Sequence, residues 1–154
     1  MSSCCFTGHR ELPRGNEYLI VAAKTRAAIL DAVNQGCTRF IAGGAIGFDM
    51  LAESMVLRLR DNDGLPITLT VYVSFRGQEM KLSIENQKRY RDIICRADEV
   101  KTLSEGYFSG CYQARNRAMV DDAAVCIAYC TKAASGTGMT VKYAQLKGVP
   151  VIRI

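Results

Sequence analysis

The fold is decided by residues 38–60, which read TRFIAGGAIGFDMLAESMVLRLR. The first five residues form a short run that ends in apolar side chains, as is typical of a buried strand. From Phe48 onward, apolar side chains recur every four positions and predict one face of an α-helix: Leu51, Met55 and Leu59. A loop with three glycines separates the two segments. The stretch therefore predicts a strand, a tight turn and a helix, which is the basic unit of an α/β protein.

The same alternation continues in both directions along the chain. Short apolar runs predict strands over residues 4–7, 38–42, 67–73, 99–103, 124–129 and 149–154. Helical periodicity predicts helices over residues 16–34, 48–60, 83–96, 112–122 and 140–147. We therefore expect an α/β fold, a three-layer Rossmann-like sandwich with a mostly parallel sheet of about six strands. This number of strands is too small for an eight-stranded barrel.

The first helix has its own start, stop and buried face. Asn16 is expected to be the N-cap, and Gly36 follows the helix as a stop signal. The face that packs on the sheet is expected to consist of Leu19, Ala23, Ala27, Leu30 and Val33.

Length and composition place the chain in an ordinary globular class. Its 154 residues predict a single domain over residues 1–154, and 49% of them are hydrophobic while 23% are charged. No apolar run reaches about 18 residues, and the N-terminus lacks the pattern of a secretory signal. We therefore expect a cytoplasmic protein without a membrane partner. The net charge of +5 weakly favours phosphate-bearing ligands.

Cysteine and histidine usage does not point to a metal. The chain has seven cysteines and one histidine, and no pair of cysteines has C-x-x-C spacing. The thiols are expected to be free and to have structural roles. Neither a metal nor a cofactor is predicted.

Unusual polar residues follow four of the predicted strands. The segments are residues 7–10 (TGHR), 43–49 (GGAIGFD), 74–77 (SFRG) and 135–138 (SGTG). In open parallel sheets, ligands bind in the crevice beyond the carboxyl ends of the strands. The sequence therefore predicts that these loops meet at one edge of the sheet and form a binding site.

The glycine loop at residues 43–47 is the strongest single feature. Glycines let backbone N–H groups approach a ligand closely, and the N-terminus of the following helix adds partial positive charge. An anion or a polar ligand fits such a loop, and a tight structural turn is the alternative. The loop matches neither G-x-G-x-x-G nor G-x-x-x-x-G-K-[ST], so the sequence favours neither NAD binding nor P-loop ATP hydrolysis.

Charged residues accompany these loops. Asp49 and Glu53 share a helix face; Asp49 would cap the helix or accept hydrogen bonds from sugar hydroxyls or a base amine. Glu53 would act as a base, orient an arginine, or simply face solvent. Arg10, Arg76 and Arg115 are candidate phosphate ligands, because a guanidinium group matches the geometry of phosphate oxygens.

Histidine and the aromatic residues could also take part in catalysis or binding. His9 is the only histidine and no G-x-S-x-G elbow is present, so triad catalysis is not favoured. The aromatic residues Tyr107, Phe108 and Tyr112 are expected to pack in the core, with stacking on a base as the alternative.

Taken together, these motifs resemble the SLOG superfamily, in its YpsA-like branch. The resemblance rests on TGHR at residues 7–10, GGAIGFDMLAE at 43–53, RNRAMVD at 115–121 and SGTGMT at 135–140. It implies a Rossmann-like fold that binds nucleotides, nucleotide-derived ligands or nucleic acid, and it suggests a homo-oligomer. The loops and the resemblance together assign ligand binding to Thr7, Gly8, His9, Arg10, Gly43, Gly44, Ala45, Gly47, Asp49, Arg76, Arg115, Asn116, Ser135, Gly136, Thr137, Gly138 and Thr140.

The resemblance leaves three functions open. The expected one is binding of a nucleotide or nucleotide-derived phosphoribosyl ligand, with a sensory or regulatory use. The first alternative is a phosphoribohydrolase that cleaves an N-glycosidic bond, with Asp49 and Glu53 as catalytic candidates. LOG-type enzymes of this kind carry P-G-G-x-G-T-x-x-E, whereas here Lys142 stands at the glutamate position. The second alternative, which the sequence favours less, is single-stranded nucleic-acid binding by the basic residues Lys88, Arg89 and Arg91.

Overall fold

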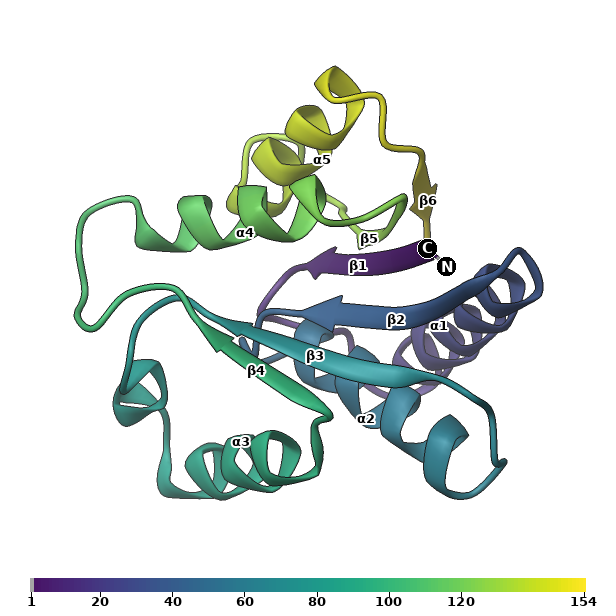
Figure 1. The fold of residues 1–154 in the computed structure, drawn as a ribbon, viewed down its shortest axis with the longest axis horizontal. Coiled ribbons are helices and arrows are strands. Elements are labelled where there is room, and N and C mark those ends of the chain that lie inside the picture. Colours follow the sequence, from purple (N-terminus) through teal and green to yellow (C-terminus); the bar gives the residue numbers. More distant parts are fainter. Residues whose placement is uncertain (1) are drawn as a thin grey trace.

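Six parallel strands form one sheet, in the order β4-β3-β2-β1-β5-β6 (Figure 1). The computed structural model describes residues 2–154. Along the chain the elements are β1 (Ser2–Gly8), α1 (Asn16–Asn34), β2 (Cys37–Ala42), α2 (Phe48–Asp61), β3 (Thr68–Val73), the 3-10 helix η1 (Gln78–Lys81), α3 (Ile84–Arg96), β4 (Glu99–Thr102), α4 (Cys111–Asp121), β5 (Val125–Tyr129), α5 (Gly136–Leu146) and β6 (Val151–Arg153). The predicted α/β Rossmann-like fold is confirmed, with a sheet that is parallel throughout.

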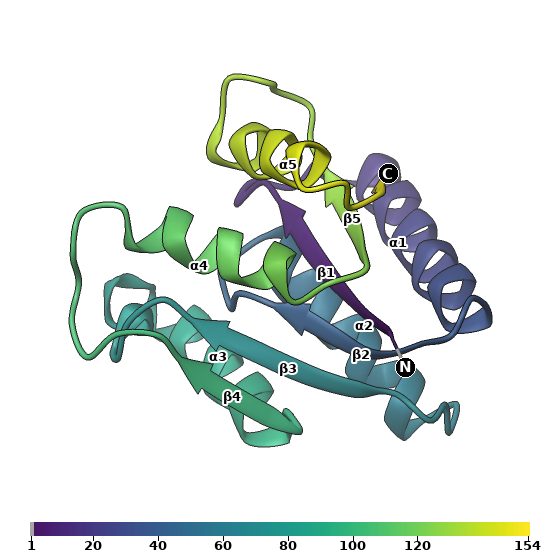
Figure 2. The same ribbon diagram turned by 45° about the horizontal axis from the view of Figure 1, so that its top comes forward.

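The helices form a layer on each side of the sheet. Helices α1, α2 and α3 pack on one face, and α4 and α5 pack together on the other (Figures 1 and 2). The chain runs outward from β1 through β2 and β3 to β4, then returns to the other side of β1 to place β5 and β6. The strand order therefore reverses between β1 and β5. Ligand crevices form at such a switch point, because the neighbouring loops diverge to opposite faces of the sheet.

The core is centred between the first two strands and helix α2. The rings of Phe6 and Phe40 stack at 5.9 Å, and Phe48 meets Phe6 edge-on at 6.3 Å. All three rings are fully buried. The apolar face predicted for α2 is buried as well: Leu51, Met55 and Leu59. This packing holds the N-terminus of α2 against the end of β1.

Helix α1 differs from its prediction in both its start and its buried face. It begins after Gly15, whose φ of +65° suits glycine, and no side chain caps it; Asn16 is already helical and is not the N-cap. Its buried residues are Val21, Thr25, Ile29 and Ala32. The predicted stripe was wrong at Leu19, Ala23 and Ala27, which are exposed, because the helix carries apolar residues on most sides. Its other two residues, Leu30 and Val33, are partly buried and do pack against the core. Thr25 can face the core since its hydroxyl donates to the carbonyl of Val21 at 2.7 Å.

Helix α5 begins four residues earlier than expected. Ser135 is its N-cap and accepts a hydrogen bond from the Gly138 amide at 3.0 Å, so residues 136–139 are helical rather than a loop. A Cβ on Gly138 would overlap the carbonyl oxygen of Ala133. Glycine is therefore required at position 138 by close packing against the backbone of Ala133, a reason that the prediction of residue 138 as part of a loop did not include.

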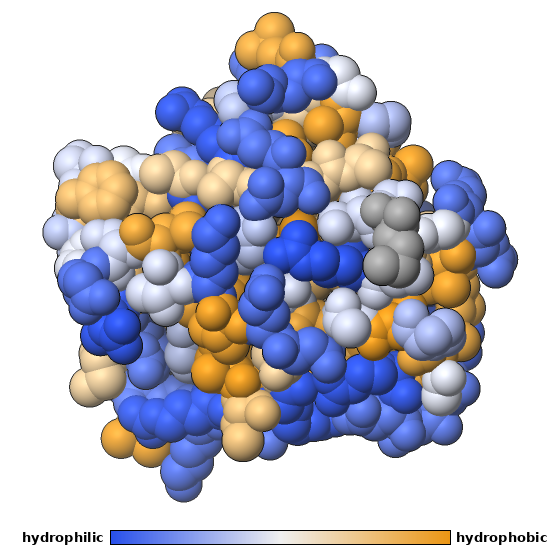
Figure 3. Space-filling view, in the orientation of Figure 1, coloured by the Kyte–Doolittle hydropathy of each residue, from blue (hydrophilic) through white to orange (hydrophobic). Residues whose placement is uncertain are grey.

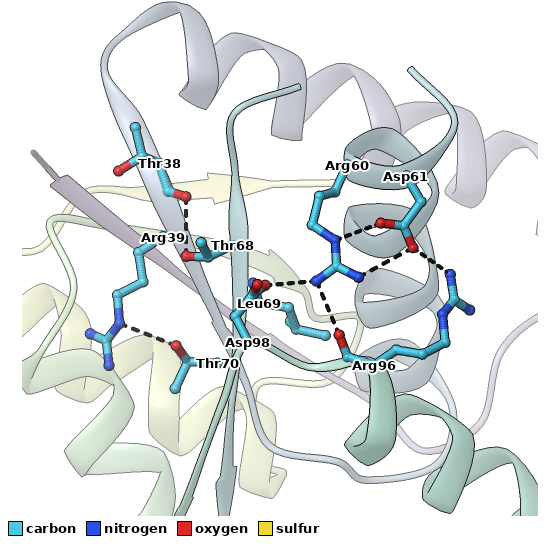
Figure 4. A network of polar contacts seen from close by, with 9 residues as sticks. All are labelled: Thr38, Arg39, Arg60, Asp61, Thr68, Leu69, Thr70, Arg96 and Asp98. Carbon is cyan, nitrogen blue, oxygen red and sulfur yellow. Dashed lines mark hydrogen bonds and ion pairs between the residues drawn. The ribbon is translucent and has the colours of Figure 1, made fainter. Parts of the chain in front are cut away.

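An ionic network closes the end of the sheet opposite the carboxyl ends of the strands (Figure 4). Asp98 accepts hydrogen bonds from the Leu69 amide at 2.8 Å and from Arg60 at 2.7 Å. Asp61 accepts from Arg60 at 2.7 Å and from Arg96 at 2.9 Å, and these two arginines lower the pKa of Asp61 to about 2. The network ties the C-terminal ends of α2 and α3 to the sheet.

Within residues 2–154, no helix covers the part of the sheet face that lies beside α4 (Figure 1). The space-filling view shows hydrophilic side chains gathered over β2, β3 and β4 on this face (Figure 3). Arg39 bonds Glu99 at 3.0 Å, Lys101 lies 4.0 Å from Asp122, and the Tyr72 hydroxyl donates to Asp122. The charged side chains on this face therefore form ion pairs with one another.

Two features are absent from the described part of the chain. No helix within residues 2–154 is long and apolar enough to span a bilayer. The same residues contain no cluster of three His, Cys, Asp or Glu side chains that could hold a metal ion. All seven cysteines are free, and five of them are buried.

Candidate ligand-binding site

A crevice of about 380 Å³ opens at the carboxyl ends of β1 and β5. Its walls come from the ends of β1, the loop before α2, the first turns of α4 and the N-terminus of α5. The lining residues are Thr7, Gly8, His9, Arg10, Ala45, Asp49, Tyr112, Gln113, Arg115, Asn116, Ser135, Gly136 and Thr137. Three of the four predicted loops thus converge, together with residues 115–116. We call this cavity the first hollow.

The structure separates the remaining predicted residues into two groups. Five do not line the first hollow: Gly43, Gly44, Gly47, Gly138 and Thr140. Arg76 lies outside it, because β3 is two strands away from β1. The exposed guanidinium of Arg76 pairs with Glu105 at 2.9 Å. The interpretation of Arg76 as a phosphate ligand in this crevice was wrong for both reasons.

Tyr112 and Gln113 line the hollow but were missing from the predicted site. Both belong to the first turn of α4, immediately before Arg115 and Asn116. For Tyr112 the signal was its aromatic ring, for which stacking on a base was the alternative to core packing; for Gln113 the signal was only its place just before the predicted Arg115. Sequence alone could not show that α4 points its N-terminal turn at the crevice.

Glycines beneath the hollow allow backbone and side chains to approach closely. A Cβ on Gly8 would lie 2.5 Å from the Cβ of Phe48, and one on Gly43 would lie 2.5 Å from a guanidinium nitrogen of Arg115. Gly47, with φ of +82°, packs against the backbone carbonyls of residues 9 and 10. These contacts bring β1, the loop before α2, and α4 together.

Asp49 already occupies the N-terminus of α2. Its carboxylate accepts a hydrogen bond from the Ala45 amide at 3.3 Å. Burial raises the pKa of Asp49, while Arg115 and the amides of Ala45 and Gly43 act in the opposite direction. A free anion would be repelled by this carboxylate, so the glycine loop presents an acceptor to the hollow rather than an anion site.

Arg115 is the buried counter-ion of this region, with only 4% of its surface exposed. It donates to the Gly43 carbonyl and, through Nε, to Asn116 at 3.0 Å. Burial lowers the pKa of Arg115, and the nearby carboxylates of Asp49 and Glu53 oppose that shift. The guanidinium therefore balances the negative charge beside the hollow.

Glu53 is 0% exposed and does not line the hollow. Neither of its carboxyl oxygens has a hydrogen-bond partner of normal geometry within residues 2–154. Burial, followed by the nearby Asp49 carboxylate, raises the pKa of Glu53 well above its usual value. The interpretation of Glu53 as a solvated helix residue was wrong, since α3 and the sheet enclose this face of α2. A sealed carboxyl group also has no path to a substrate in the hollow.

His9 lies in the wall as a neutral imidazole. Its Nε2 accepts a hydrogen bond from the Thr131 amide at 2.8 Å, which requires an unprotonated Nε2. Burial, with Lys132 nearby, lowers the pKa of His9. The residue thus fixes the loop after β5 to the end of β1.

The cationic side of the hollow lies at Arg10 and at the N-terminus of α5. Ser135, Gly136 and Thr137 line the hollow where the first-turn amides of this helix begin. Arg10 is exposed, its guanidinium lies 5.3 Å from the centre of the Tyr112 ring, and no carboxylate within residues 2–154 forms a salt bridge with it. An anion in the hollow would meet these donors, while hydroxyl or amine groups would meet Asp49.

A comparison with protein families matches residues 5–147 to the model named YpsA, described as the YspA SLOG family. A curated relative, UPF0398 protein BH1768 of Halalkalibacterium halodurans, is 28% identical over 102 residues. That match covers 66% of this chain and 52% of the relative, so the chain spans about half the length of the curated relative that it matches.

Two solved structures share the fold. DNA processing protein A from Helicobacter pylori, described for its single-stranded DNA binding mode, superposes with a TM-score of 0.69 at 19% identity, covering 99% of this chain and 64% of that one. DprA from Streptococcus pneumoniae gives a TM-score of 0.69 at 18% identity, covering 99% and 50%.

Proposed function

Because the chain belongs to the YspA SLOG family, we propose that the first hollow binds a nucleotide or a nucleotide-derived phosphoribosyl ligand. One observation carries the proposal. A single cavity is lined both by hydrogen-bond donors for an anion, at Arg10 and the N-terminus of α5, and by a hydrogen-bond acceptor, the carboxylate of Asp49. A phosphate needs the donors, and ribose hydroxyls need the acceptor. The cavity of about 380 Å³ lies within the usual range for small-molecule sites.

Binding without cleavage is favoured by the position of the carboxyl groups. Lys142, which stands where LOG-type enzymes carry glutamate, is exposed on α5 and does not line the hollow. Glu53 is sealed beneath it, so Asp49 is the only carboxylate among the residues that line the hollow. Glycosidic cleavage usually employs a carboxylate to assist the leaving group or water, and Asp49 is already engaged with Ala45 and the charge of Arg115.

Arg10→Ala should weaken the binding of a nucleoside 5′-monophosphate about ten- to hundredfold and leave the affinity for the matching nucleoside nearly unchanged. The reason is that a charge-assisted hydrogen bond contributes roughly 1.5–3 kcal/mol. Isothermal titration calorimetry with AMP and adenosine measures both affinities. Arg76→Ala is the matched control, because Arg76 is also an exposed arginine after a strand but pairs with Glu105 outside the hollow. Equal weakening of AMP and adenosine would reassign Arg10 to a structural role.

Purified protein should release no free base from nucleoside 5′-monophosphates at rates typical of a hydrolase. The assay incubates the protein with a panel of these nucleotides and follows free base by chromatography. Turnover above about 1 s⁻¹, near the low end of ordinary enzymes, that is lost in Asp49→Asn would establish the enzyme instead.

Single-stranded nucleic acid is a second candidate ligand. It is favoured by the fold shared with the Helicobacter pylori protein, described for its single-stranded DNA binding mode. Lys88, Arg89 and Arg91 are exposed on α3, as a basic surface for a phosphate backbone would require. Affinity that falls steeply with salt concentration would identify this mode, since backbone contacts release counterions.

A further inference from the structure

A second hollow of about 270 Å³ adjoins the first. The two share a ridge formed by Arg10, Ala45, Tyr112 and Arg115. The rest of the second hollow is lined by Gly44, Ile46, Gln78, Glu79, Lys81 and Leu82. Its outer wall is therefore η1 and the residue that follows it.

The wall formed by η1 is held in place before any ligand arrives. The Gln78 side chain donates to the Gly43 carbonyl at 3.1 Å and accepts from the Ser74 amide at 2.8 Å. These bonds fasten η1 to the loops that follow β2 and β3. Ile46 and Leu82 supply apolar surface, while Glu79 and Lys81 add polar groups at the wall. A pre-formed cavity with this mixed apolar and polar lining is typical of small-molecule sites.

Aromatic rings stand beside this hollow. Tyr112 belongs to the shared ridge, Tyr107 lies 6.3 Å from it between ring centres, and Phe75 lies 5.6 Å from Tyr107. Tyr107 is 61% exposed and Phe108 is also exposed, so the expectation that these two residues pack in the core was wrong. The loop that joins β4 to α4 carries both rings out to the surface, where they are open to stacking by a base.

Positive charge accompanies the rings. The Arg10 guanidinium lies 5.3 Å from the centre of the Tyr112 ring, and the Lys81 ammonium lies 5.5 Å from that of Tyr107. Neither cation forms a salt bridge with a carboxylate in the described chain. The ridge and its outer side thus combine ring faces with two cations, Arg10 and Lys81, that form no salt bridge in the described chain, which is the chemistry that recognises a base next to a phosphate.

We propose that the two hollows together hold two nucleosides joined through phosphate, with the phosphate at Arg10 on the shared ridge and the second base beside Tyr107 and Lys81. The inference rests on the proposed function of the first hollow and extends it to a larger ligand. Free dinucleotides and adjacent nucleotides of a single strand share this chemistry.

The test compares three probes by calorimetry: AMP, di(adenosine-5′) diphosphate and a twelve-residue deoxyadenosine strand. Wild-type protein should bind the dinucleotide about five- to hundredfold more tightly than AMP, which is the range that stacking of one additional base supplies. Tyr107→Ala and Lys81→Ala should each remove most of this gain and leave AMP affinity within about threefold. Unchanged AMP affinity also reports an intact fold in both variants.

Lys147→Ala is the matched control. Lys147 likewise lies over a tyrosine ring, 5.7 Å from the centre of Tyr143, but just after α5 and away from both hollows. The Lys147→Ala variant should keep the full difference in affinity between the dinucleotide and AMP.

Each outcome bears on a different part of the inference. AMP binding without any gain for the dinucleotide overturns the second base position and leaves the proposed function standing. Binding of none of the three probes overturns the proposed function and the inference with it. A gain for the dinucleotide that both variants retain also overturns the inference. Where the gain depends on Tyr107, tighter and strongly salt-dependent binding of the strand identifies nucleic acid as the source, and equal or weaker binding identifies a free dinucleotide.

Discussion

Gly47→Ala should lower the free energy of unfolding by about 3 kcal/mol, a large share of the 5–15 kcal/mol typical of a domain. Gly47 has φ of +82° at the start of α2, which already disfavours a side chain by roughly 1 kcal/mol or more. The added Cβ would overlap the carbonyl oxygen of Arg10 and lie 2.6 Å from that of His9. Relieving this overlap moves the backbone, for which overpacking costs of about 1–3 kcal/mol are usual.

The displaced backbone also belongs to the binding site. The Phe48 amide donates to the His9 carbonyl at 3.0 Å, so moving α2 away from β1 should shift Arg10 and weaken nucleotide binding as well. Urea denaturation measures the stability change, and calorimetry with AMP measures the binding change.

Gly64→Ala separates conformational strain from overlap. Gly64 has a similar φ of +68°, but a Cβ added there would meet no atom within 4 Å other than those of its chain neighbours. In this variant the free energy of unfolding should fall by only roughly 1 kcal/mol, the cost of a side chain in this backbone conformation, and AMP binding should be unchanged. Equal destabilisation by both substitutions would show that the approach of α2 to β1 contributes little.

Glu53→Gln should stabilise the protein at neutral pH. Burial and the nearby Asp49 raise the pKa of Glu53 in the folded state, so the folded protein retains a proton that the unfolded chain releases above about pH 4.3. Below that pH the wild type has no penalty from Glu53. Above it, wild-type stability falls by up to about 1.4 kcal/mol per pH unit until the folded-state pKa is passed. Glutamine has the same shape and lacks this titration.

The measurement is urea denaturation of both proteins from pH 4 to pH 8. The advantage of the variant should grow as the pH rises above about 4.3, until the folded-state pKa of Glu53 is passed. Asp49, whose pKa is also raised, is present in both proteins, so its contribution largely cancels. Glu17→Gln, at an exposed glutamate in the first turn of α1, is the matched control for the effect of a glutamate-to-glutamine change by itself. A constant difference between wild type and Glu53→Gln across the range would mean that Glu53 titrates normally.

Much of the architecture could be predicted from local patterns. The β2 strand, the glycine turn and α2 were expected within two residues of their observed bounds, because their periodicity and turn residues agree with the tertiary packing. Helix α1 shows where this reasoning fails. It is apolar on several sides, so its packing against the sheet and against α2, rather than its own hydrophobic pattern, determines which face is buried.

The candidate site divides in the same way. Arg10 and Arg76 look alike in sequence, since each follows a predicted strand and lies close to a glycine. In the fold, Arg10 stands at the strand-order switch with no carboxylate partner in the described chain, whereas Arg76 pairs with Glu105 two strands away.

The sequence by itself determined the order of strands and helices and the glycine loops that follow the strands. These depend on residue spacing and backbone conformation, which act within a few positions of the chain. Only the tertiary structure decided that Asp49 lines a hollow while Glu53, one turn later, is sealed beneath it, and that Tyr107 faces solvent. Burial and charge compensation come from residues far apart in the chain, such as Arg115 against Gly43 and η1 against the loop after β2, so no local pattern contains them.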